Sequence, residues 1–250
     1  MKYSFSGHSV LVTGAASGIG AATARLLAAN GLSVVVSDVQ ADAVQAVVKE
    51  IEQAGGKAVA NVADVTQPDQ LKAAVDGAIE HFGALHFAVN NAGVAGDSGP
   101  AGEMDLDGWR RLIDINLNGV AYGLRYQIPA ILAAGGGAIV NMSSIMGLVA
   151  NPTLPGYNAA KHGVIGLSRS AALEYSSKGV RINTIHPGYV DTPILSGLDD
   201  AARAALVDQH PIGRLGHADE IAHAIAFLLS DGASFMTGAC MVADGGYTAK

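Results

Sequence analysis

Short apolar runs alternate with longer segments of helical periodicity along the whole chain. The runs are rich in β-branched residues and lack strict apolar–polar alternation, which is typical of strands buried on both faces. They cover residues 9–13, 33–37, 58–62, 87–90, 138–142, 181–186 and 240–243. Alanine-rich segments with helical periodicity lie between them, at residues 18–30, 41–54, 68–82, 106–133, 157–177 and 219–229. This alternation predicts a doubly wound (Rossmann) α/β fold, with a parallel sheet of about seven strands and helices on both faces in three layers.

One segment, residues 191–213, interrupts the alternation. It begins after Pro187-Gly188 and carries Leu195, Leu198 and Leu206. We expect a loop with one or two short helices at the carboxyl edge of the sheet, where it would cover a ligand. A purely structural excursion is the alternative.

The composition fits a single domain spanning residues 1–250. Half of the 250 residues are hydrophobic and 15% are charged, so the chain can build a sizeable core. The net charge of -7 is scattered and no basic stripe is present, so we expect no nucleic-acid partner. The eight histidines form no ligand pattern, and we expect no metal.

The chain also carries few signs of export. Its single cysteine, Cys240, allows no intrachain disulfide and favours a reducing compartment. The N-terminal sequence does not have the pattern of a signal peptide, and no segment approaches the ~18 apolar residues of a spanning helix. We therefore expect a soluble, cytoplasmic protein without a membrane partner.

A glycine-rich turn follows the first predicted strand. It reads Thr13-Gly14-Ala15-Ala16-Ser17-Gly18-Ile19-Gly20, and a helix begins at once. Glycines let the chain turn tightly and let backbone approach a pyrophosphate, while the helix N-terminus offers free N–H groups and a positive dipole end. The turn predicts a dinucleotide site, whereas a helix-packing turn is the alternative.

The second predicted strand ends at Asp38, close to the offset expected for an acid that binds the adenosine ribose. Its carboxylate would accept hydrogen bonds from ribose hydroxyls and repel a 2′-phosphate. No arginine or lysine stands in the glycine turn or beside Asp38-Val39, so NAD is favoured over NADP. A role for Asp38 as a helix cap is the alternative.

Two further strand ends lie where the cofactor should run. Asp64-Val65 follows the third strand, and could bond the adenine amino group. Asn90-Asn91-Ala92-Gly93 follows the fourth, where adjacent amides can tie strands together and leave room for a ribose. Each would be an ordinary turn if it stood alone.

Tyr157 and Lys161 stand four residues apart at the start of a helical segment, which places them on one helix face. A free tyrosine has a pKa of about 10, and bringing it near neutrality needs about 4 kcal/mol. A nearby cation in a desolvated site can supply energy of that order, and NAD⁺ would add a second positive charge. Tyr157 could then take a hydroxyl proton while hydride leaves for the cofactor. An ordinary surface pair is the alternative.

Two polar residues accompany this pair. Ser144 follows the fifth strand at the edge where ligands bind, and could donate to a substrate oxygen. Asn116 is a poor helix former inside an apolar helix, although a satisfied amide on the helix surface would be equally ordinary.

These motifs together resemble the short-chain dehydrogenase/reductase family, over essentially the whole chain. Residues 13–20 match its TGxxxGxG turn, residues 90–93 its NNAG, Tyr157 with Lys161 its YxxxK, and Pro187-Gly188 its PG. The resemblance implies Tyr157 as general acid/base, Ser144 orienting the substrate oxygen, Lys161 also binding the nicotinamide ribose, and Asn116 helping to hold a water that relays protons from Lys161. It places Pro187, Gly188, Val190 and Thr192 around the nicotinamide. It further implies a homodimer or homotetramer.

The candidate substrate pocket is mostly apolar. Its residues are Val94, Ser144, Met146, Asn151, Tyr189, Ile194 and Leu195, with no arginine or lysine to clamp an anion. We therefore expect a small cyclic or aromatic secondary alcohol and its ketone, and the resemblance is strongest to members acting on cyclic alcohols and diols. Two alternatives stay open: an NADPH-dependent biosynthetic ketoreductase, which Asp38 disfavours, and an NAD-binding protein without chemistry, which the intact Asn-Ser-Tyr-Lys set disfavours.

Overall fold

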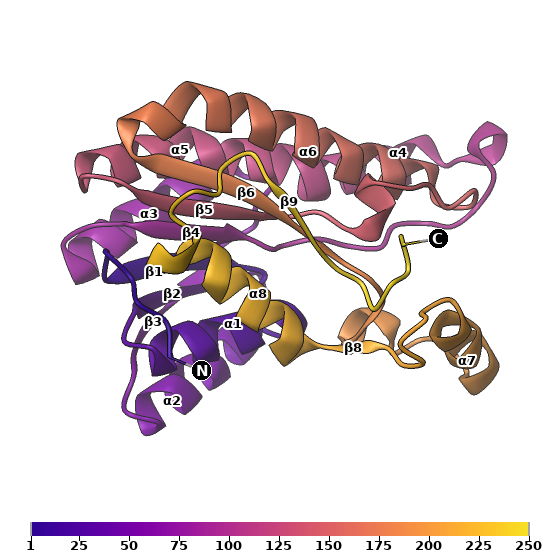
Figure 1. Cartoon of the computed structure of the whole chain (residues 1–250), viewed down its shortest axis with the longest axis horizontal. Helices are drawn as coiled ribbons and strands as arrows, with labels where there is room; N and C mark the ends of the chain where they lie inside the picture. The colour runs from indigo at the N-terminus through magenta and orange to yellow at the C-terminus, as the bar shows by residue number, and fades with distance from the viewer. Residues whose placement is uncertain (1, 250) are drawn as a thin grey trace.

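A seven-stranded parallel sheet forms the middle layer of the computed structural model, which describes residues 2–249 (Figure 1). The strand order is β3-β2-β1-β4-β5-β6-β9. The strands are β1 (Ser9–Thr13), β2 (Ser33–Asp38), β3 (Lys57–Val62), β4 (Phe87–Asn90), β5 (Gly137–Met142), β6 (Val180–Pro187) and β9 (Cys240–Ala243). All seven predicted strands are present, and the doubly wound fold is confirmed. The order reverses between β1 and β4, and such a switch point opens a crevice for ligands.

Helices cover both faces of the sheet. On one face lie α1 (Gly18–Ala29), α2 (Ala41–Gln53) and α8 (Ala218–Leu229), and on the other α3 (Pro68–Phe82), α5 (Gly119–Ala133) and α6 (Pro155–Tyr175). In β1, Val10 and Val12 join the core under α1 and α8, while Leu11 joins the core under α3 and α5. This burial on both faces explains why the strands read as continuous apolar runs.

The segment predicted as one helix over residues 106–133 is divided in the structure. The helix α4 (Leu106–Ile113) passes through a π-helical turn (Asp114–Asn118) into α5. Gly119 directly follows the π turn, but a single glycine in an apolar helical pattern does not indicate the extra residue per turn. The π turn contains the buried Asn116, and such turns recur at functional sites.

The start of α6 also differs from the prediction. The helix begins at Pro155, two residues before the predicted start, since proline is well suited to the first helical position. Tyr157 therefore lies within the first turn of α6.

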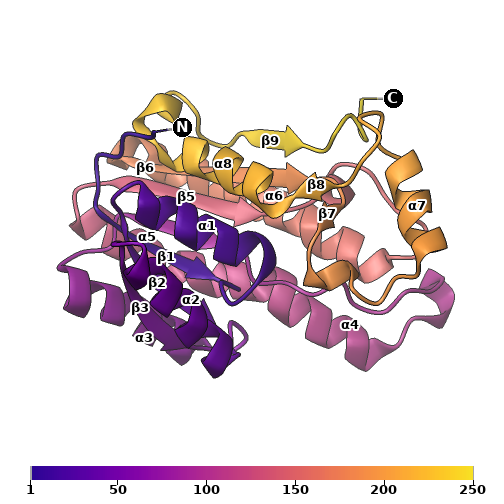
Figure 2. The same ribbon diagram turned by 90° about the horizontal axis from the view of Figure 1, so that it is seen from below.

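The excursion after β6 forms a separate lobe at the carboxyl edge of the sheet. It holds β7 (Val190–Asp191), a 3₁₀ turn (Pro193–Leu195) and α7 (Asp200–Asp208), and β7 pairs with β8 (Gly216–His217). Figure 2 shows α7 standing apart from the helices that pack on the sheet. An ion pair of 2.5 Å between Arg203 and Asp191 ties α7 back to β7. The two-residue strands were not predicted, because they are too short to show a period.

Within residues 2–249, the helices lack the combined length and apolar character that crossing a bilayer requires.

Candidate active site

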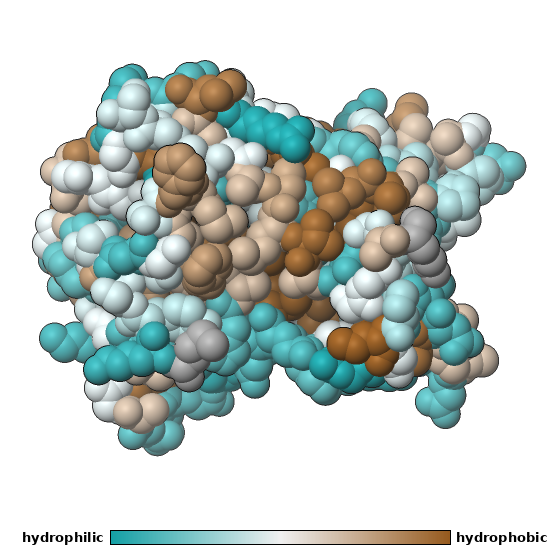
Figure 3. All heavy atoms as spheres, viewed as in Figure 1, coloured by the Kyte–Doolittle hydropathy of each residue, from teal (hydrophilic) through white to brown (hydrophobic). Residues whose placement is uncertain are grey.

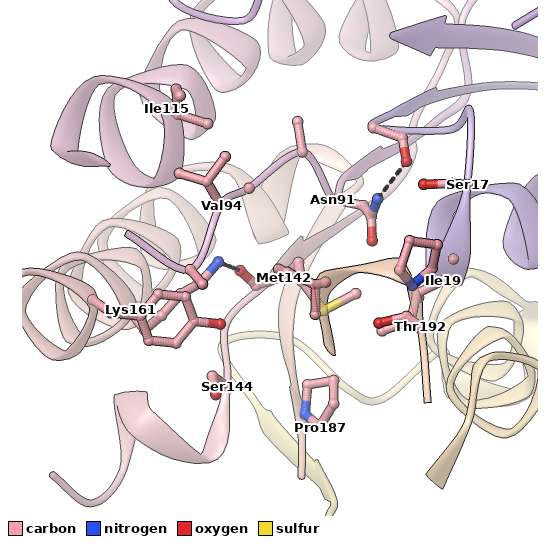
Figure 4. A pocket seen from close by; sticks show the side chains of 18 of the residues that line it. Ser17, Ile19, Asn91, Val94, Ile115, Met142, Ser144, Lys161, Pro187 and Thr192 are labelled. Carbon is pink, nitrogen blue, oxygen red and sulfur yellow. Dashed lines mark hydrogen bonds between the residues drawn. The ribbon is translucent and has the colours of Figure 1, made fainter. Parts of the chain in front are cut away.

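The carboxyl ends of the central strands surround a cleft of about 980 Å³ that reaches from the end of β2 to the start of α6 (Figure 4). Most of the predicted site residues line it. They are Gly14, Ser17, Gly18, Ile19, Asp38, Val39, Asp64, Val65, Asn91, Ala92, Gly93, Val94, Ser144, Met146, Tyr157, Lys161, Pro187, Gly188, Tyr189, Val190, Thr192, Ile194 and Leu195.

Four predicted residues do not line the cleft. A Cβ at Gly20 would collide with the carbonyl oxygen of Gly14, so Gly20 serves the packing of the turn. The buried Asn90 exchanges hydrogen bonds with Gln127, and the amide of Asn151 accepts from the Thr153 backbone N–H at 3.0 Å. Asn116 does not line the cleft, but its side chain is hydrogen-bonded to the backbone of Val94, which does.

Sequence reasoning missed several cleft residues. Arg111, Asp114 and Ile115 line the cleft from α4 and the π turn, and Leu154 lines it just before α6. The first three lie three and four residues apart, and so share one helix face. That spacing was visible, but nothing in the sequence shows which face of α4 meets the cleft. Arg111 brings an exposed cation to a cleft in which the sequence indicated only Lys161.

The glycine turn has the shape that a phosphate cradle needs. Gly14 and Gly18 have φ of 63° and 52°, in the left-handed region that side chains disfavour. A Cβ at Gly14 would lie 2.7 Å from the Ala92 Cα atom, because β1 and β4 approach each other here. The Asn91 side chain donates to the carbonyls of Thr13 and Gly14, both at 3.0 Å, and so fixes the turn.

The N-terminus of α1 faces this turn without a side-chain cap. Ser17 at the N-cap makes no capping hydrogen bond, and the first turn carries no acid. The free N–H groups and the positive dipole end are therefore available to an anion in the cleft.

Two carboxylates stand at the far end of the cleft. Asp38 accepts from the backbone N–H of Ala16 at 3.1 Å and of Gln40 at 3.2 Å, so its carboxylate is held between the glycine turn and the end of β2. Asp64 accepts from the backbone N–H of Thr66 at 2.9 Å. Both carboxylates line the cleft.

Tyr157, Lys161 and Ser144 meet at the other end. The side chain of Ser144 lies next to the phenol of Tyr157 and acts on its pKa. The ammonium of Lys161 lies 5.4 Å from the centroid of the Tyr157 ring and donates to the Met142 carbonyl at 3.0 Å (Figure 4). The helix α6 thus aims two side chains at the end of β5, as their spacing predicted.

The electrostatics of this pair differ from the expectation. Burial raises the pKa of Tyr157, the side chain of Ser144 acts in the opposite direction, and Tyr189 raises it further. Burial lowers the pKa of Lys161 from 10.5 to about 8. The expected lowering of the tyrosine pKa is therefore not found, because the loss of water around the phenol outweighs the effect of neighbouring groups.

Asn116 and Lys161 share a small space above Gly93. The Asn116 side chain accepts from the Val94 N–H and donates to the Val94 carbonyl, both at 2.8 Å. A Cβ at Gly93 would lie 3.1 Å from Asn116 Oδ1 and 3.6 Å from Lys161 Nζ. The absence of a side chain at Gly93 therefore lets both polar groups approach the backbone here.

The lining of the cleft is mostly apolar. It includes Val94, Ile145, Met146, Leu154 and Leu195. Within residues 2–249, no three His, Cys, Asp or Glu side chains are placed to hold a metal ion. The arrangement combines an anion cradle, two carboxylates and a Tyr-Ser-Lys cluster in one cleft.

Known proteins share this arrangement over the whole chain. The family model described as "Enoyl-(Acyl carrier protein) reductase" matches residues 14–248. Cyclohexanol dehydrogenase of Acinetobacter sp. (strain SE19) is 54% identical over 250 residues, covering 100% of this chain and 98% of the relative. Cis-4-hydroxycyclohexanecarboxylate dehydrogenase of Sinomonas cyclohexanicum is 48% identical over 249 residues, covering 100% of both.

A solved structure gives the same answer in three dimensions. A short-chain type dehydrogenase/reductase from Mycobacterium marinum superposes with a TM-score of 0.93 at 34% identity, covering 99% of this chain and 98% of that one. The sequence matches and the superposition agree with the glycine turn and the Tyr-Lys helix, and on these grounds the chain belongs to the short-chain dehydrogenase/reductase family.

Proposed function

We propose that the protein oxidises a small cyclic secondary alcohol to its ketone with NAD as hydride acceptor, and catalyses the reverse reduction. The observation that carries this proposal is the placement of Tyr157, Ser144 and Lys161 in one cleft, largely apolar, that also holds a glycine cradle and Asp38. The curated relatives named above are dehydrogenases of cyclic alcohols, which supports the same substrate class.

The residues of the cleft fit a nicotinamide dinucleotide. The free amides of α1 and the glycine turn would hold the pyrophosphate. Asp38 would bind the adenosine ribose, and Asp64 with Val65 would bind the adenine. Pro187, Gly188, Val190 and Thr192 would surround the nicotinamide, and Lys161 would bind its ribose. When bound, NAD⁺ would accept the hydride and add a positive charge near Tyr157.

Asp38 favours NAD over NADP. Its carboxylate is fixed by two backbone N–H groups, so it cannot swing away from a 2′-phosphate without losing both bonds. The cations among the cleft residues are Arg111 and Lys161, and neither belongs to the glycine turn or to the residues beside Asp38. A 2′-phosphate would therefore meet a like charge without a cation to offset it.

The chain's own groups would divide the proton chemistry. Ser144 donates to the substrate oxygen and Tyr157 removes the hydroxyl proton during oxidation. Positive charge from Lys161 and the cofactor must offset the burial that disfavours the phenolate. A water that Asn116 helps to hold would take the proton from Lys161 and carry it onward. The apolar wall matches a hydrocarbon ring, and the ring has few polar groups that the wall would leave unpaired.

We also infer a homodimer or homotetramer. Leu173 on α6 is 87% exposed and Phe235 before β9 is fully exposed. Figure 3 shows apolar side chains gathered on the face over α8 and β9. Exposed apolar surface of this kind favours contact with another copy of the chain.

Steady-state kinetics test the proposal. We expect kcat/KM for cyclohexanol to be at least about tenfold higher with NAD than with NADP, because one like-charge contact costs about 1.4 kcal/mol or more. The same assay is run with two further substrates, cis-4-hydroxycyclohexanecarboxylate and a 3-hydroxyacyl thioester. A larger kcat/KM with NADP, or for the thioester, would instead indicate a biosynthetic ketoreductase. A preference for the carboxylate would overturn the apolar pocket and point to Arg111.

A further inference from the structure

Ser144 lies just beyond the point where sheet pairing ends. In the register of β5 and β6, Met142 stands opposite Ile185, and the Ser143 N–H donates to the Ile185 carbonyl at 2.9 Å. In a parallel ladder, the next donor from β6 would be the N–H of residue 187, toward the Ser143 carbonyl. That residue is Pro187, which has no N–H. The ladder between β5 and β6 therefore ends at Ser143, and Ser144 lies beyond it.

The side chain of His186 reaches past the end of this ladder to Ser144. Its Nδ1 lies 3.0 Å from the Ser144 carbonyl oxygen, and its Nε2 lies 2.7 Å from the Thr184 hydroxyl. His186 is completely buried, and it does not line the cleft. It therefore contacts Ser144 from behind and is not placed to touch a ligand.

The hydrogen bonds allow one arrangement of protons on the ring. A carbonyl oxygen only accepts, so Nδ1 must carry the hydrogen. A neutral ring then accepts through Nε2, and the Thr184 hydroxyl donates to it. Burial lowers the pKa of His186; its bond to Ser144 raises it, and the charges of Arg169, Lys161 and His162 lower it. The ring thus acts as a neutral, fixed bridge between β6 and Ser144.

The position of the Ser144 backbone decides where its hydroxyl points. The hydroxyl oxygen accepts from the Met146 N–H at 3.1 Å and lies next to Tyr157. With one lone pair committed to Met146, a small rotation of the Ser144 backbone would break this bond or turn the hydroxyl away from Tyr157 and the substrate. In Figure 4, Ser144 lies between Lys161 and Pro187 at this end of the cleft.

We propose that His186 is a positioning residue, which holds the Ser144 carbonyl and thereby aims the Ser144 hydroxyl at the substrate oxygen. This role rests on the proposed function, since it matters to turnover only if Ser144 contacts a reacting alcohol. The Ser144 carbonyl also accepts from the Gly147 N–H at 2.9 Å within its own 3₁₀ turn, so the imidazole is the contact that ties this turn to β6.

Two variants of nearly equal size separate the hydrogen bond from packing. His186→Asn keeps a donor near the position of Nδ1, whereas His186→Leu has the same branching and no donor. Thr184 keeps the Ala239 carbonyl at 3.3 Å as an acceptor in both. We expect H186L to lower kcat by about tenfold, a fraction of the loss from deleting a donor outright, while H186N stays within about threefold of wild type. NADH affinity should be unchanged in both.

A double-mutant cycle tests whether His186 acts through Ser144. In a Ser144→Ala background, H186L should lower kcat no further, because the hydroxyl it aims is gone. Independent losses that multiply, or equal losses in H186N and H186L, would overturn the proposal.

Hydrogen exchange at the Met146 amide gives a readout without turnover. We expect exchange in the cofactor-free protein to be about tenfold faster in H186L than in wild type, and unchanged in H186N. Equal exchange in all three proteins overturns the role of His186. A wild type that exchanges as expected but oxidises no alcohol would contradict the proposed function alone.

Discussion

Burial acts in opposite directions on the two ionisable residues of the Tyr157–Lys161 pair. It raises the pKa of Tyr157 and lowers that of Lys161 to about 8, so each shift is toward the neutral form, while Lys161 still carries its proton at pH 7. The pair is therefore not activated by its own geometry. In our account the positive charge of the cofactor provides the stabilisation of the Tyr157 phenolate that Lys161 alone does not. Formation of the phenolate is thereby coupled to cofactor binding.

The lysine shift has a consequence for stability. An unfolded chain keeps the Lys161 proton up to a pKa of 10.5, whereas the folded chain releases it at about 8. Between these values the unfolded state binds more protons, so the contribution of Lys161 to stability rises with pH.

We therefore predict that wild type gains stability relative to Lys161→Met as the pH rises from 7 toward 10.5. The gain in the free energy of unfolding should approach about 3 kcal/mol, at 1.36 kcal/mol per pKa unit. Urea unfolding of both proteins across this range measures it, and groups that titrate in both proteins cancel in the difference. A difference that does not change with pH would mean that Lys161 keeps an ordinary pKa.

At the scale of single residues, the sequence predicted which residues form the site better than it predicted the environment of each side chain. The positions of Tyr157, Lys161 and Ser144 could be predicted because their spacing and their place after a strand carry the information. The direction of the Tyr157 pKa shift could not be predicted, because the burial of the phenol depends on segments that are distant in the sequence. Asn151 was expected in the substrate pocket, but its amide accepts from the Thr153 backbone N–H instead.

At the scale of secondary-structure elements, one buried histidine, His210, connects the helix α7 to a residue that lines the cleft. His210 Nδ1 lies 2.8 Å from the Leu206 carbonyl in α7, and its Nε2 accepts from the Tyr189 N–H at 3.1 Å. Its ring also packs on Tyr247 with centroids 5.4 Å apart. Since Tyr189 lines the cleft, His210 connects α7 and the C-terminal segment to the substrate end.

We predict that His210→Phe raises KM for the alcohol by about five- to tenfold, because it keeps a ring but loses two hydrogen bonds worth about 1 kcal/mol or more together. KM for NAD should change less than twofold. Steady-state kinetics on both substrates measures this. His81→Phe, an exposed histidine near the end of α3, is the matched control. Equal effects of the two substitutions would contradict the link.

The secondary-structure elements differ in how well the sequence predicts them. Buried strands such as β1 and β6 were predicted because apolar β-branched runs have few other uses. The π turn at residues 114–118 was not predicted, since one extra residue per turn barely alters an apolar pattern. The pair β7–β8 has two residues in each strand, and its pairing depends on contacts between segments about 25 residues apart.

On the scale of the whole molecule, the cleft is built from the carboxyl ends of strands that lie far apart in sequence. The turn after β1 meets Ala92 after β4, and Thr192 after β7 packs against Gly18. A single site of this size requires the parallel order with its reversal between β1 and β4. The strand–helix alternation and the family motifs therefore predicted where the site lies. They did not predict that Arg111 lines the cleft, because tertiary packing decides which face of α4 meets the cleft.

The most direct test of the central claim is NADH formation from cyclohexanol by wild type and Tyr157→Phe at saturating NAD. We predict that wild type turns over and that Y157F loses at least about 10³-fold in kcat, within the range general acid/base groups contribute. NADH affinity, followed by fluorescence, should stay within about threefold because the phenyl ring keeps the packing. Turnover by Y157F within about tenfold of wild type would contradict the assignment of Tyr157 as the group that moves the proton.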